Sequence, residues 1–349
     1  MESEVASSRR PLPSRRVAMA LTLFFGPGVG HTYLGMARRG LWWALLPPLA
    51  GLVLCASVIR ARAGYGLIVP GILLIVLVRL GALVDVFIVP ERRLRRTSLG
   101  WVFLFWIATV ACAVGLSFVI RSHVMQAFKI PGGSMQPTLL VEDHVYVAMG
   151  AFRREPAKRG ELAVFVHPEY PEQDYVKRVI ALPGDKIEVR DGHPLLNGWA
   201  VPHCSVGKGV ALPPGKADDA VIESRGDLEL EYLGDQSYLV FLDDRVMEMD
   251  GQTWTVAPNE LFVLGDNRNN SADSRIWFHG RGGGVPFENL IGPPLFIWLA
   301  FRADGSVDWQ RMNQRLDGPH LPPTLAALEP ALRACLRSKP VQTEPPAAH

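Results

Sequence analysis

Long apolar stretches dominate the first third of the chain. Residues 41–59 and 100–120 contain no charged side chain. The length of each stretch is close to that of a bilayer-spanning helix, which has about 20 residues. Residues 65–90 are also long enough, although Arg79 and Asp85 interrupt them. Charged groups in lipid are costly unless they reach the interface or face protein. The pattern predicts three membrane-spanning helices.

An earlier apolar stretch, residues 19–36, is interrupted by Gly26, Pro27 and Gly28 and contains His31. It indicates a broken helix, a re-entrant hairpin or a weak span. No simple apolar core with a small-residue cleavage site precedes it, so the opening residues are not typical of a cleavable signal peptide.

After residue 120 the apolar runs become short and are separated by turn residues. We expect strands at 144–148, 162–167, 175–182, 186–190, 227–233, 237–242, 253–256, 261–264 and 295–300. Asp191 and Gly192 predict a hairpin after the fourth of these. Strands and helices do not alternate, so a parallel sheet is not expected. The predicted fold class is N-terminal transmembrane α-helices followed by a mostly-β domain.

Composition divides the chain further. We expect a membrane module at 1–120, a β-rich domain at 121–318 with a loop-rich insertion at about 199–226, and a Pro/Ala-rich flexible tail at 319–349. Cys55 and Cys112 lie in predicted spans, whereas Cys204 and Cys335 lie in the part of the chain after the spans. These last two either form a disulfide or remain free thiols.

Charge is distributed unevenly. The sequence has a net charge of +2, yet residues 1–120 hold 13 Lys and Arg against 4 Asp and Glu, a net of +9, and residues 121–349 carry −7. Positive charge beside apolar spans marks the cytoplasmic side of a membrane. The basic excess is therefore a topology signal and does not indicate a nucleic-acid partner.

Arginine clusters then orient the spans. Four arginines between positions 92 and 96 favour the cytoplasm, so residues 100–120 lead outward and the chain after Arg121 lies outside. The arginines at 9, 10, 15 and 16 also favour the cytoplasm, which requires that residues 19–36 do not cross. We expect three spans, with four as the alternative.

Two short runs in the β-rich part combine residue types that make chemical sense together. In the run Pro131 to Thr138, two glycines precede Ser134, and in Tyr175 to Ile180 apolar residues surround Lys177. A serine hydroxyl needs a base to take its proton, and a lysine is that base only when burial keeps its amine neutral. The pair predicts a nucleophile and a general base, with the Ser134 backbone N–H directed at an oxyanion.

A third run, Leu264 to Arg275, contains hydroxyls, amides and an Asp/Arg pair. In this order the three runs, together with the strand Asp143 to Val147, resemble those of type I signal peptidases, the membrane-bound Ser/Lys proteases that remove signal peptides from exported proteins. The nucleophile run here is Ser-Met-Gln-Pro-Thr-Leu, and the late run Gly-Asp-Asn-Arg-Asn-Asn-Ser-Ala-Asp-Ser-Arg is complete. The resemblance covers roughly residues 120–300.

The resemblance implies further roles. Ser271 would orient the Lys177 amine, and Asp273 and Arg275 would form a supporting ion pair. Gly132 stands where many relatives carry a serine that is the second oxyanion donor, so that donor is missing here, although other relatives also have glycine. The positions that match the family's substrate pocket are Phe128, Ile130, Pro131, Met135, Leu139, Tyr175 and Val176.

The function implied is removal of signal peptides from exported preproteins with small-x-small cleavage sites, at the outer face of a bacterial cytoplasmic (inner) membrane, by a multi-pass enzyme in contact with lipid. No cofactor is implied. The histidines at 144, 167, 193, 203 and 279 lack ligand-like spacing, so no metal is predicted.

Two other classes remain open. A repressor-type Ser/Lys autoprotease shares the chemistry but needs a DNA-binding segment, against which the spans argue. A non-catalytic membrane protein would have no need of Ser134, Lys177 and Ser271 together. General or dedicated substrates and the oligomeric state are not readable from the sequence.

Overall fold

The computed structural model describes residues 12–61, 65–95, 97–211, 215–217, 220–222, 225–243, 251–302 and 304–345. The chain forms two compact units, which divide near residue 122. The arginines at positions 9, 10, 62 and 96 lie outside the described residues.

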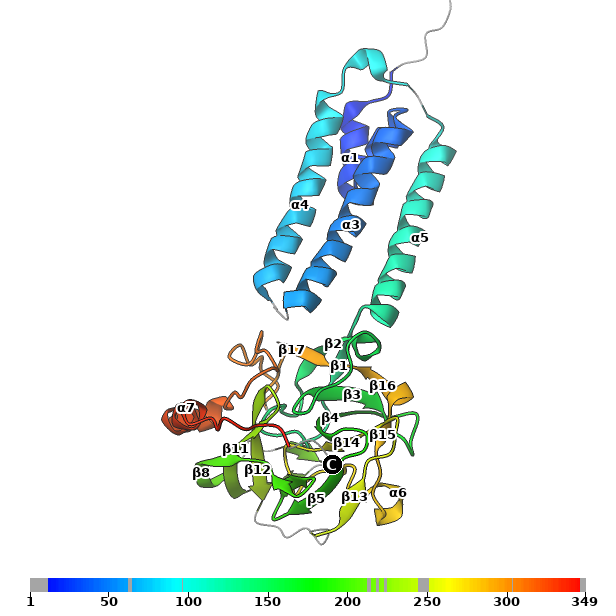
Figure 1. The fold of residues 1–349 in the computed structure, drawn as a ribbon. Coiled ribbons are helices and arrows are strands. Elements are labelled where there is room, and N and C mark those ends of the chain that lie inside the picture. Colours follow the sequence, from blue (N-terminus) through cyan, green and yellow to red (C-terminus); the bar gives the residue numbers. More distant parts are fainter. Residues whose placement is uncertain are drawn as a thin grey trace, which may run out of the picture. The chain divides into compact units, whose positions relative to one another are not determined.

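The first unit is helical (Figure 1). Its helices are α1 (Arg15–Phe25), α2 (Val29–Tyr33), α3 (Ala37–Ala61), α4 (Tyr65–Ile88), η1 (Glu91–Arg93) and α5 (Leu99–His123). Three stretches among the described residues are long and apolar enough to cross a membrane: Ala37–Arg60, Val69–Ile88 and Leu99–His123. They coincide with the three predicted spans. Most of their large apolar side chains are exposed, as expected of helices whose solvent is lipid.

The segment at 19–36 is broken, as its glycines predict. Helix α1 ends at Gly26, whose φ is 110°, and α2 starts after Gly28, whose φ is 94°. Both values are unfavourable for residues with a Cβ. A Cβ on Gly28 would lie 2.1 Å from the carbonyl oxygen of Gly40 in α3, so this glycine also permits close approach of the backbones.

The charged residue Asp85 in α4 faces protein. Its carboxylate accepts hydrogen bonds from Arg39 Nε at 2.7 Å and Trp43 Nε1 at 2.8 Å, and it lies 2.9 Å from Nε2 of the buried His31. These partners offset the cost of a carboxylate in an apolar helix. Arg79 donates to the carbonyl oxygen of Leu23. Both interrupting charges are therefore compatible with a spanning helix.

The second unit is mostly β, as predicted. Its strands are β1 (Met125–Lys129), β2 (His144–Ala148), β3 (Leu162–Val166), β4 (Asp174–Ala181), β5 (Lys186–Arg190), β6 (His193–Leu196), β7 (Trp199–Ala200), β8 (His203–Ala211), β9 (Gly215–Ala217), β10 (Ala220–Ile222), β11 (Arg225–Leu233), β12 (Gln236–Asp243), β13 (Thr253–Thr255), β14 (Glu260–Leu264), β15 (Val285–Pro286), β16 (Leu290–Gly292) and β17 (Pro294–Leu299). Its short helices are η2 (Ala151–Arg153), α6 (Trp277–Gly280), η3 (Phe287–Asn289), η4 (Pro323–Leu328) and α7 (Glu329–Arg337).

The ladders between these strands are antiparallel, as the absence of a strand and helix alternation predicts. The largest sheet has the order β15-β14-β4-β3-β16, and others have the orders β13-β5-β6-β7, β12-β11-β8 and β1-β2-β17. The predicted hairpin joins β5 to β6, with positive φ at Asp191 and Gly192.

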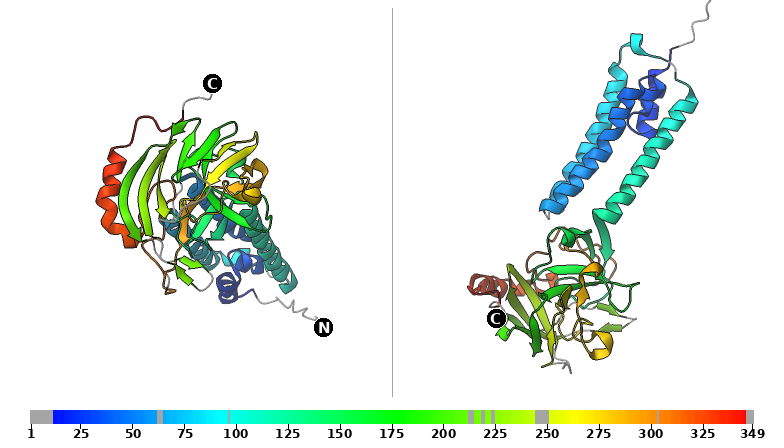
Figure 2. Two further views of the ribbon diagram at one scale, coloured as in Figure 1. Left: turned by 90° about the horizontal axis from the view of Figure 1, so that it is seen from below. Right: turned by 45° about the vertical axis from the view of Figure 1, so that its right-hand side comes forward.

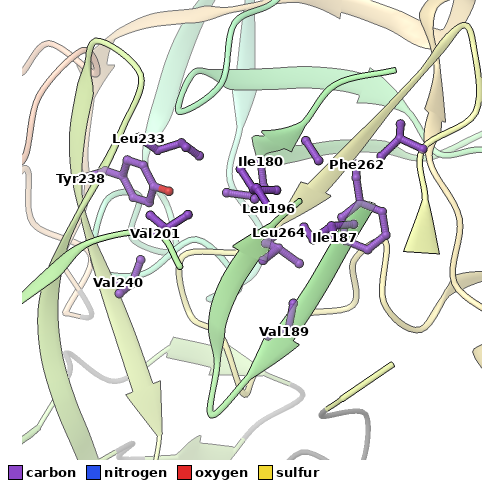
Figure 3. Packing of buried hydrophobic residues seen from close by; sticks show 12 residues of the cluster. Ile180, Ile187, Val189, Leu196, Val201, Leu233, Tyr238, Val240, Phe262 and Leu264 are labelled. Atoms are coloured by element: carbon purple, nitrogen blue, oxygen red, sulfur yellow. The ribbon is translucent and has the colours of Figure 1, made fainter. Parts of the chain in front are cut away.

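Apolar side chains from different sheets pack into a shared core. In Figure 3, Ile180 of β4, Ile187 of β5 and Leu264 of β14 point toward one another. All three are completely buried. Burying a side chain of this size stabilises the fold by about 1.5–3 kcal/mol, and the cluster fixes β4, the strand that carries Lys177.

The predicted loop-rich insertion at 199–226 is wrong for much of its length. Residues 203–211 form β8, which pairs with β11 from His203 opposite Glu231 to Ala211 opposite Arg225. Two glycines and the polar residues of β8 weaken its local strand signal, but β11 supplies the hydrogen bonds. Residues 212–214, 218, 219, 223 and 224 lie outside the description.

The predicted flexible tail is wrong for residues 323–337. Pro330 does not break the apolar periodicity because it lies in the first turn of α7, where a proline is tolerated. Leu332 and Cys335 are buried against the sheet of β8 and β11, and Figure 2 shows α7, in red, lying along these strands. Cys335 forms a disulfide with Cys204. This settles the alternative that the sequence leaves open.

Candidate active site

Ser134 and Lys177 meet in the second unit. Ser134 lies in a turn between β1 and β2, and Lys177 lies on β4. Lys177 Nζ is 2.5 Å from Ser134 Oγ, a short hydrogen bond between residues 43 positions apart. The fold therefore brings together the two residues that the sequence predicts as nucleophile and base, at a distance suited to proton transfer.

The Lys177 amine lies in a water-poor environment. The side chain is almost fully buried, and this burial lowers its pKa from 10.5 to about 8. Asp273 and Asp266 act in the opposite direction, while Arg275 adds to the lowering. A substantial fraction of the amines is consequently neutral at mildly alkaline pH, which a general base requires.

A cavity of about 320 Å³ opens beside the pair. Its lining includes six of the seven predicted substrate-pocket residues: Phe128, Ile130, Pro131, Met135, Tyr175 and Val176. The seventh, Leu139, does not line this cavity and is fully buried in the core with Val145 and Val147. Its assignment to the pocket is therefore not supported, because the turn that follows Ser134 carries it inward.

Gly132 also lines the cavity and is exposed. No atom lies within 4 Å of where its Cβ would be, and its φ is not in the left-handed region. The backbone at this position therefore accepts residues other than glycine.

Ser271 is buried beside the turn that carries Ser134, but the predicted hydrogen bond to Lys177 is absent. Among the described residues, Ser271 Oγ has no hydrogen-bond partner. The side chain faces Gly265: a Cβ there would lie 2.1 Å from Ser271 Oγ and 2.5 Å from the carbonyl oxygen of Ser134. Packing against these backbone groups accounts for its position.

The predicted ion pair between Asp273 and Arg275 is formed. Arg275 donates to both carboxylate oxygens, with distances of 2.8 and 2.9 Å, and both side chains are buried. Burial by itself raises the pKa of Asp273, but Arg275 outweighs it and holds the pKa below its ordinary value. Asp273 also accepts from the Gly265 N–H at 3.0 Å, so the pair fixes the loop beside Ser134.

Asn267 is a positioning residue that the sequence reasoning does not single out. Its side-chain amide donates to the carbonyl oxygen of Gly133 at 3.1 Å, and its backbone N–H donates to that of Ser134 at 3.1 Å. The two bonds hold the carbonyl groups of Gly133 and Ser134 and so fix the backbone of the turn that carries Ser134. Its place in the run Leu264 to Arg275 marks it as a candidate, although the run does not indicate its contacts.

A second unpredicted contact lies on the opposite face of β4. Arg178 follows Lys177, and strand alternation directs it away from the cavity. It donates to both carboxylate oxygens of Asp266, at 2.7 and 2.5 Å, and Thr138 Oγ1 donates to the same carboxylate at 2.5 Å. Three segments that carry the site are thus joined by one buried carboxylate.

Comparison with known proteins identifies the family of this chain. The family described as signal peptidase, peptidase S26, matches residues 103–299, more than half of the chain. The chain therefore belongs to the signal peptidase family and is a protease by family. It joins this domain to helices long enough to cross a membrane.

Individual relatives carry the same description. A signal peptidase I of Buchnera aphidicola subsp. Acyrthosiphon pisum is 31% identical over 228 residues, and the match covers 53% of this chain and 71% of the relative. A signal peptidase I of Pseudomonas aeruginosa is 31% identical over 202 residues, and the match covers 52% of this chain and 68% of the relative. A crystal structure of a signal peptidase I from Enterococcus faecalis matches with a TM-score of 0.22 and 24% identity, covering 40% of this chain and 97% of that one.

Proposed function

We propose that this chain is a membrane-bound endopeptidase that removes signal peptides from exported preproteins, with Ser134 as nucleophile and Lys177 as general base. The observation that carries the proposal is the 2.5 Å contact between Ser134 Oγ and the buried Lys177 Nζ. Burial disfavours the charged ammonium form of a lysine, so the buried amine can accept a proton, whereas a solvated lysine is already protonated near neutral pH.

The chemistry follows from these positions. Lys177 accepts the Ser134 proton as the hydroxyl oxygen attacks the scissile carbonyl, and it then protonates the leaving amine. The Ser134 backbone N–H stabilises the oxyanion. Water, with Lys177 again as base, releases the acyl group from Ser134. Asn267 and the Asp273–Arg275 pair support the geometry through the backbone and do not touch the reacting atoms. The reaction needs no cofactor.

The cavity supports the choice of substrate. Its apolar side chains, among them Phe128, Ile130 and Val176, line a space of about 320 Å³, which is suited to short apolar side chains of an extended peptide. Substrates with small residues at the first and third positions before the cut meet this requirement. Preproteins with small-x-small sites are therefore the proposed substrates.

The basic residues of the first unit support a multi-pass arrangement in the bacterial inner membrane. With the arginines near position 93 in the cytoplasm, α5 leads outward and the catalytic domain lies on the extracytoplasmic side. That is where signal peptides of exported proteins reach an endopeptidase. The basic residues on the N-terminal side of the broken α1–α2 segment support three spans over four.

The rival classes have less support. The helices of the first unit argue against a DNA-bound autoprotease. A protein without catalytic activity gains nothing from burying a lysine amine against a serine hydroxyl, because burial of a cationic group is costly.

The direct test uses the purified full-length chain in detergent and a preprotein with an Ala-x-Ala site. We expect one cut after the second alanine, and none when tryptophan replaces that alanine. Cleavage of the tryptophan substrate at the same rate would contradict the substrate proposal. No cleavage of any preprotein by the folded wild-type chain would contradict the proposed function.

A further inference from the structure

Two histidines and a glutamate from separate strands meet away from the active site. His193 begins β6, His203 begins β8, and Glu229 lies on β11. One possible ligand atom of each lies within 4.8 Å of the others. The imidazole rings are stacked, with centroids 4.0 Å apart. The sequence gives no ligand-like spacing because the three residues lie on three separate strands, β8 and β11 of one sheet and β6 of another.

The hydrogen-bond environment fixes which ring nitrogens face the glutamate. His193 Nδ1 lies 3.4 Å from Glu231 Oε1, and His203 Nδ1 lies 3.5 Å from the carbonyl oxygen of Val201. Both neighbours are acceptors, so each Nδ1 carries the proton of a neutral ring. The Nε2 lone pairs then face Glu229 Oε2, at 3.5 Å from His193 and 3.8 Å from His203.

Three acceptors facing one another need a positive group between them. Glu229 Oε2 is buried, and within the described part of the chain it has no hydrogen-bond partner. An unsatisfied buried carboxylate oxygen is costly. The other carboxylate, Glu231, is already neutralised by Arg268, which donates to both its oxygens at 2.6 and 2.5 Å. The negative charge that is still available to bind a cation is therefore that of the Glu229 carboxylate.

We propose that His193 Nε2, His203 Nε2 and a Glu229 carboxylate oxygen bind one Zn²⁺ ion. Two imidazoles and a carboxylate form a ligand set typical of Zn²⁺, with bonds of about 2.0–2.2 Å and a fourth position for water. The separations of 3.5 and 3.8 Å between the histidine nitrogens and the Glu229 oxygen leave room for one ion between them. Mg²⁺ and Ca²⁺ prefer sets of oxygen ligands and do not fit two imidazoles.

The surroundings have the features of a built metal site. Glu231 would hold His193 through Nδ1, as carboxylates behind metal-bound histidines do. The His203 side chain is 43% exposed while that of Glu229 is 14% exposed, so the ion has a path from solvent to an otherwise covered position. The disulfide at the neighbouring Cys204 fixes β8, the strand that presents His203.

The site is connected to the catalytic loop through hydrogen bonds. Arg268, which holds Glu231, also donates from Nε to the carbonyl oxygen of Gly265 at 3.2 Å. Zn²⁺ would tie β6 to β8 and β11 and so stabilise the loop that carries Asn267. Its role is stabilisation of the domain, because none of its ligands contacts Ser134 or Lys177.

The test measures Zn²⁺ binding to the full-length chain, purified in detergent without a histidine tag and stripped with a chelator. Competition with a chromophoric chelator gives the affinity, and elemental analysis gives the stoichiometry. We expect the wild type to bind one Zn²⁺ per chain with a Kd below about 10 µM. His203→Ala and Glu229→Gln should each bind at least tenfold more weakly. His123→Ala, which alters another exposed histidine, is the control and should bind as the wild type does. Thermal unfolding with Zn²⁺ or Mg²⁺ provides a second readout. Zn²⁺ should raise the wild-type Tm and leave that of Glu229→Gln unchanged.

Either of two results overturns the proposal. One is the absence of Zn²⁺ binding at 10 µM, which would mean that protonated histidines satisfy Glu229. The other is equal affinity in the wild type and both site variants, which would place the ion elsewhere. Circular dichroism verifies folding, and Glu229→Gln keeps the size of the side chain if His203→Ala does not fold.

Discussion

Gly265 lies so close to Ser271 that no side chain fits between them. A Cβ at position 265 would lie 2.1 Å from Ser271 Oγ and 2.4 Å from Ser271 Cβ. The carbonyl oxygen of Ser134 would be only 2.5 Å away on the other side. Position 265 therefore requires glycine because of the close approach of Ser271 and the Ser134 backbone. Backbone conformation is not the reason, since its φ is outside the left-handed region.

Gly265→Ala should inactivate the enzyme. The methyl group must displace Ser271 or the Ser134 backbone, and an error of about 1 Å in the position of a nucleophile costs on the order of 10²-fold in rate. Preprotein cleavage by the purified variant measures the effect. Gly318→Ala is the matched control, since its Cβ meets no atom within 4 Å. Activity of Gly265→Ala near the wild-type level would show that the loop adjusts freely.

Gly132→Ser should leave kcat unchanged or raise it modestly. An oxyanion donor contributes about 2.7–4 kcal/mol when preorganised, but no neighbouring atom within 4 Å orients a side chain here. Gly132→Val should lower kcat/KM clearly, because its side chain would enter the cavity proposed to bind the substrate. Both variants should keep the wild-type Tm. Inactivation by serine in a folded protein would instead assign an essential role to the glycine backbone.

Lys177→Met should stabilise the domain in a pH-dependent manner. The folded pKa of about 8 is below the ordinary 10.5, so between these values the unfolded chain holds a proton that the folded chain lacks, and wild-type stability rises with pH. Methionine removes this linkage. Its advantage should be largest below about pH 8, at up to about 3 kcal/mol, and should decline toward pH 10.5. Denaturant unfolding at several pH values measures it, and a difference that is constant with pH would contradict the buried amine.

The topology can be tested by cysteine labelling of intact cells. With Cys55 and Cys112 replaced and the disulfide retained, a cysteine at the exposed position of Lys208 should react with an impermeant reagent, whereas one at Arg93 should react only after lysis. The reverse pattern would exclude the proposed orientation. A reporter fused near Ser7, which lies outside the described residues, should be cytoplasmic with three spans and external with four.

Much of the fold is readable from the sequence where local pattern and tertiary environment agree. The apolar spans and the runs around Lys177 and Leu264 have the length and period of the elements that they form. β8 and α7 are not readable from the local sequence because partners that are distant in sequence stabilise them. Pro330 in particular would break a helix at an interior position, but it is compatible with the first turn, where it lies in α7.

Some residues of the candidate site are likewise readable from the sequence, and others are not. Ser134 and Lys177 are readable because their chemistry requires particular neighbours along the chain. The contacts of Asn267 and the meeting of His193 with His203 depend on how loops and sheets pack, which no local pattern encodes. The position of Ser271 against Gly265, in place of a bond to Lys177, is likewise a packing result.

The central claim is that a neutral, buried Lys177 activates Ser134, and the pH dependence of kcat/KM for preprotein cleavage tests it most directly. Activity requires the deprotonated amine, so the rate should rise with pH through an ionisation near the pKa of about 8. Ser134→Ala and Lys177→Ala should be inactive at every pH while remaining folded and membrane-inserted. A rate that rises only near pH 10.5, or substantial activity in either variant, would contradict the mechanism.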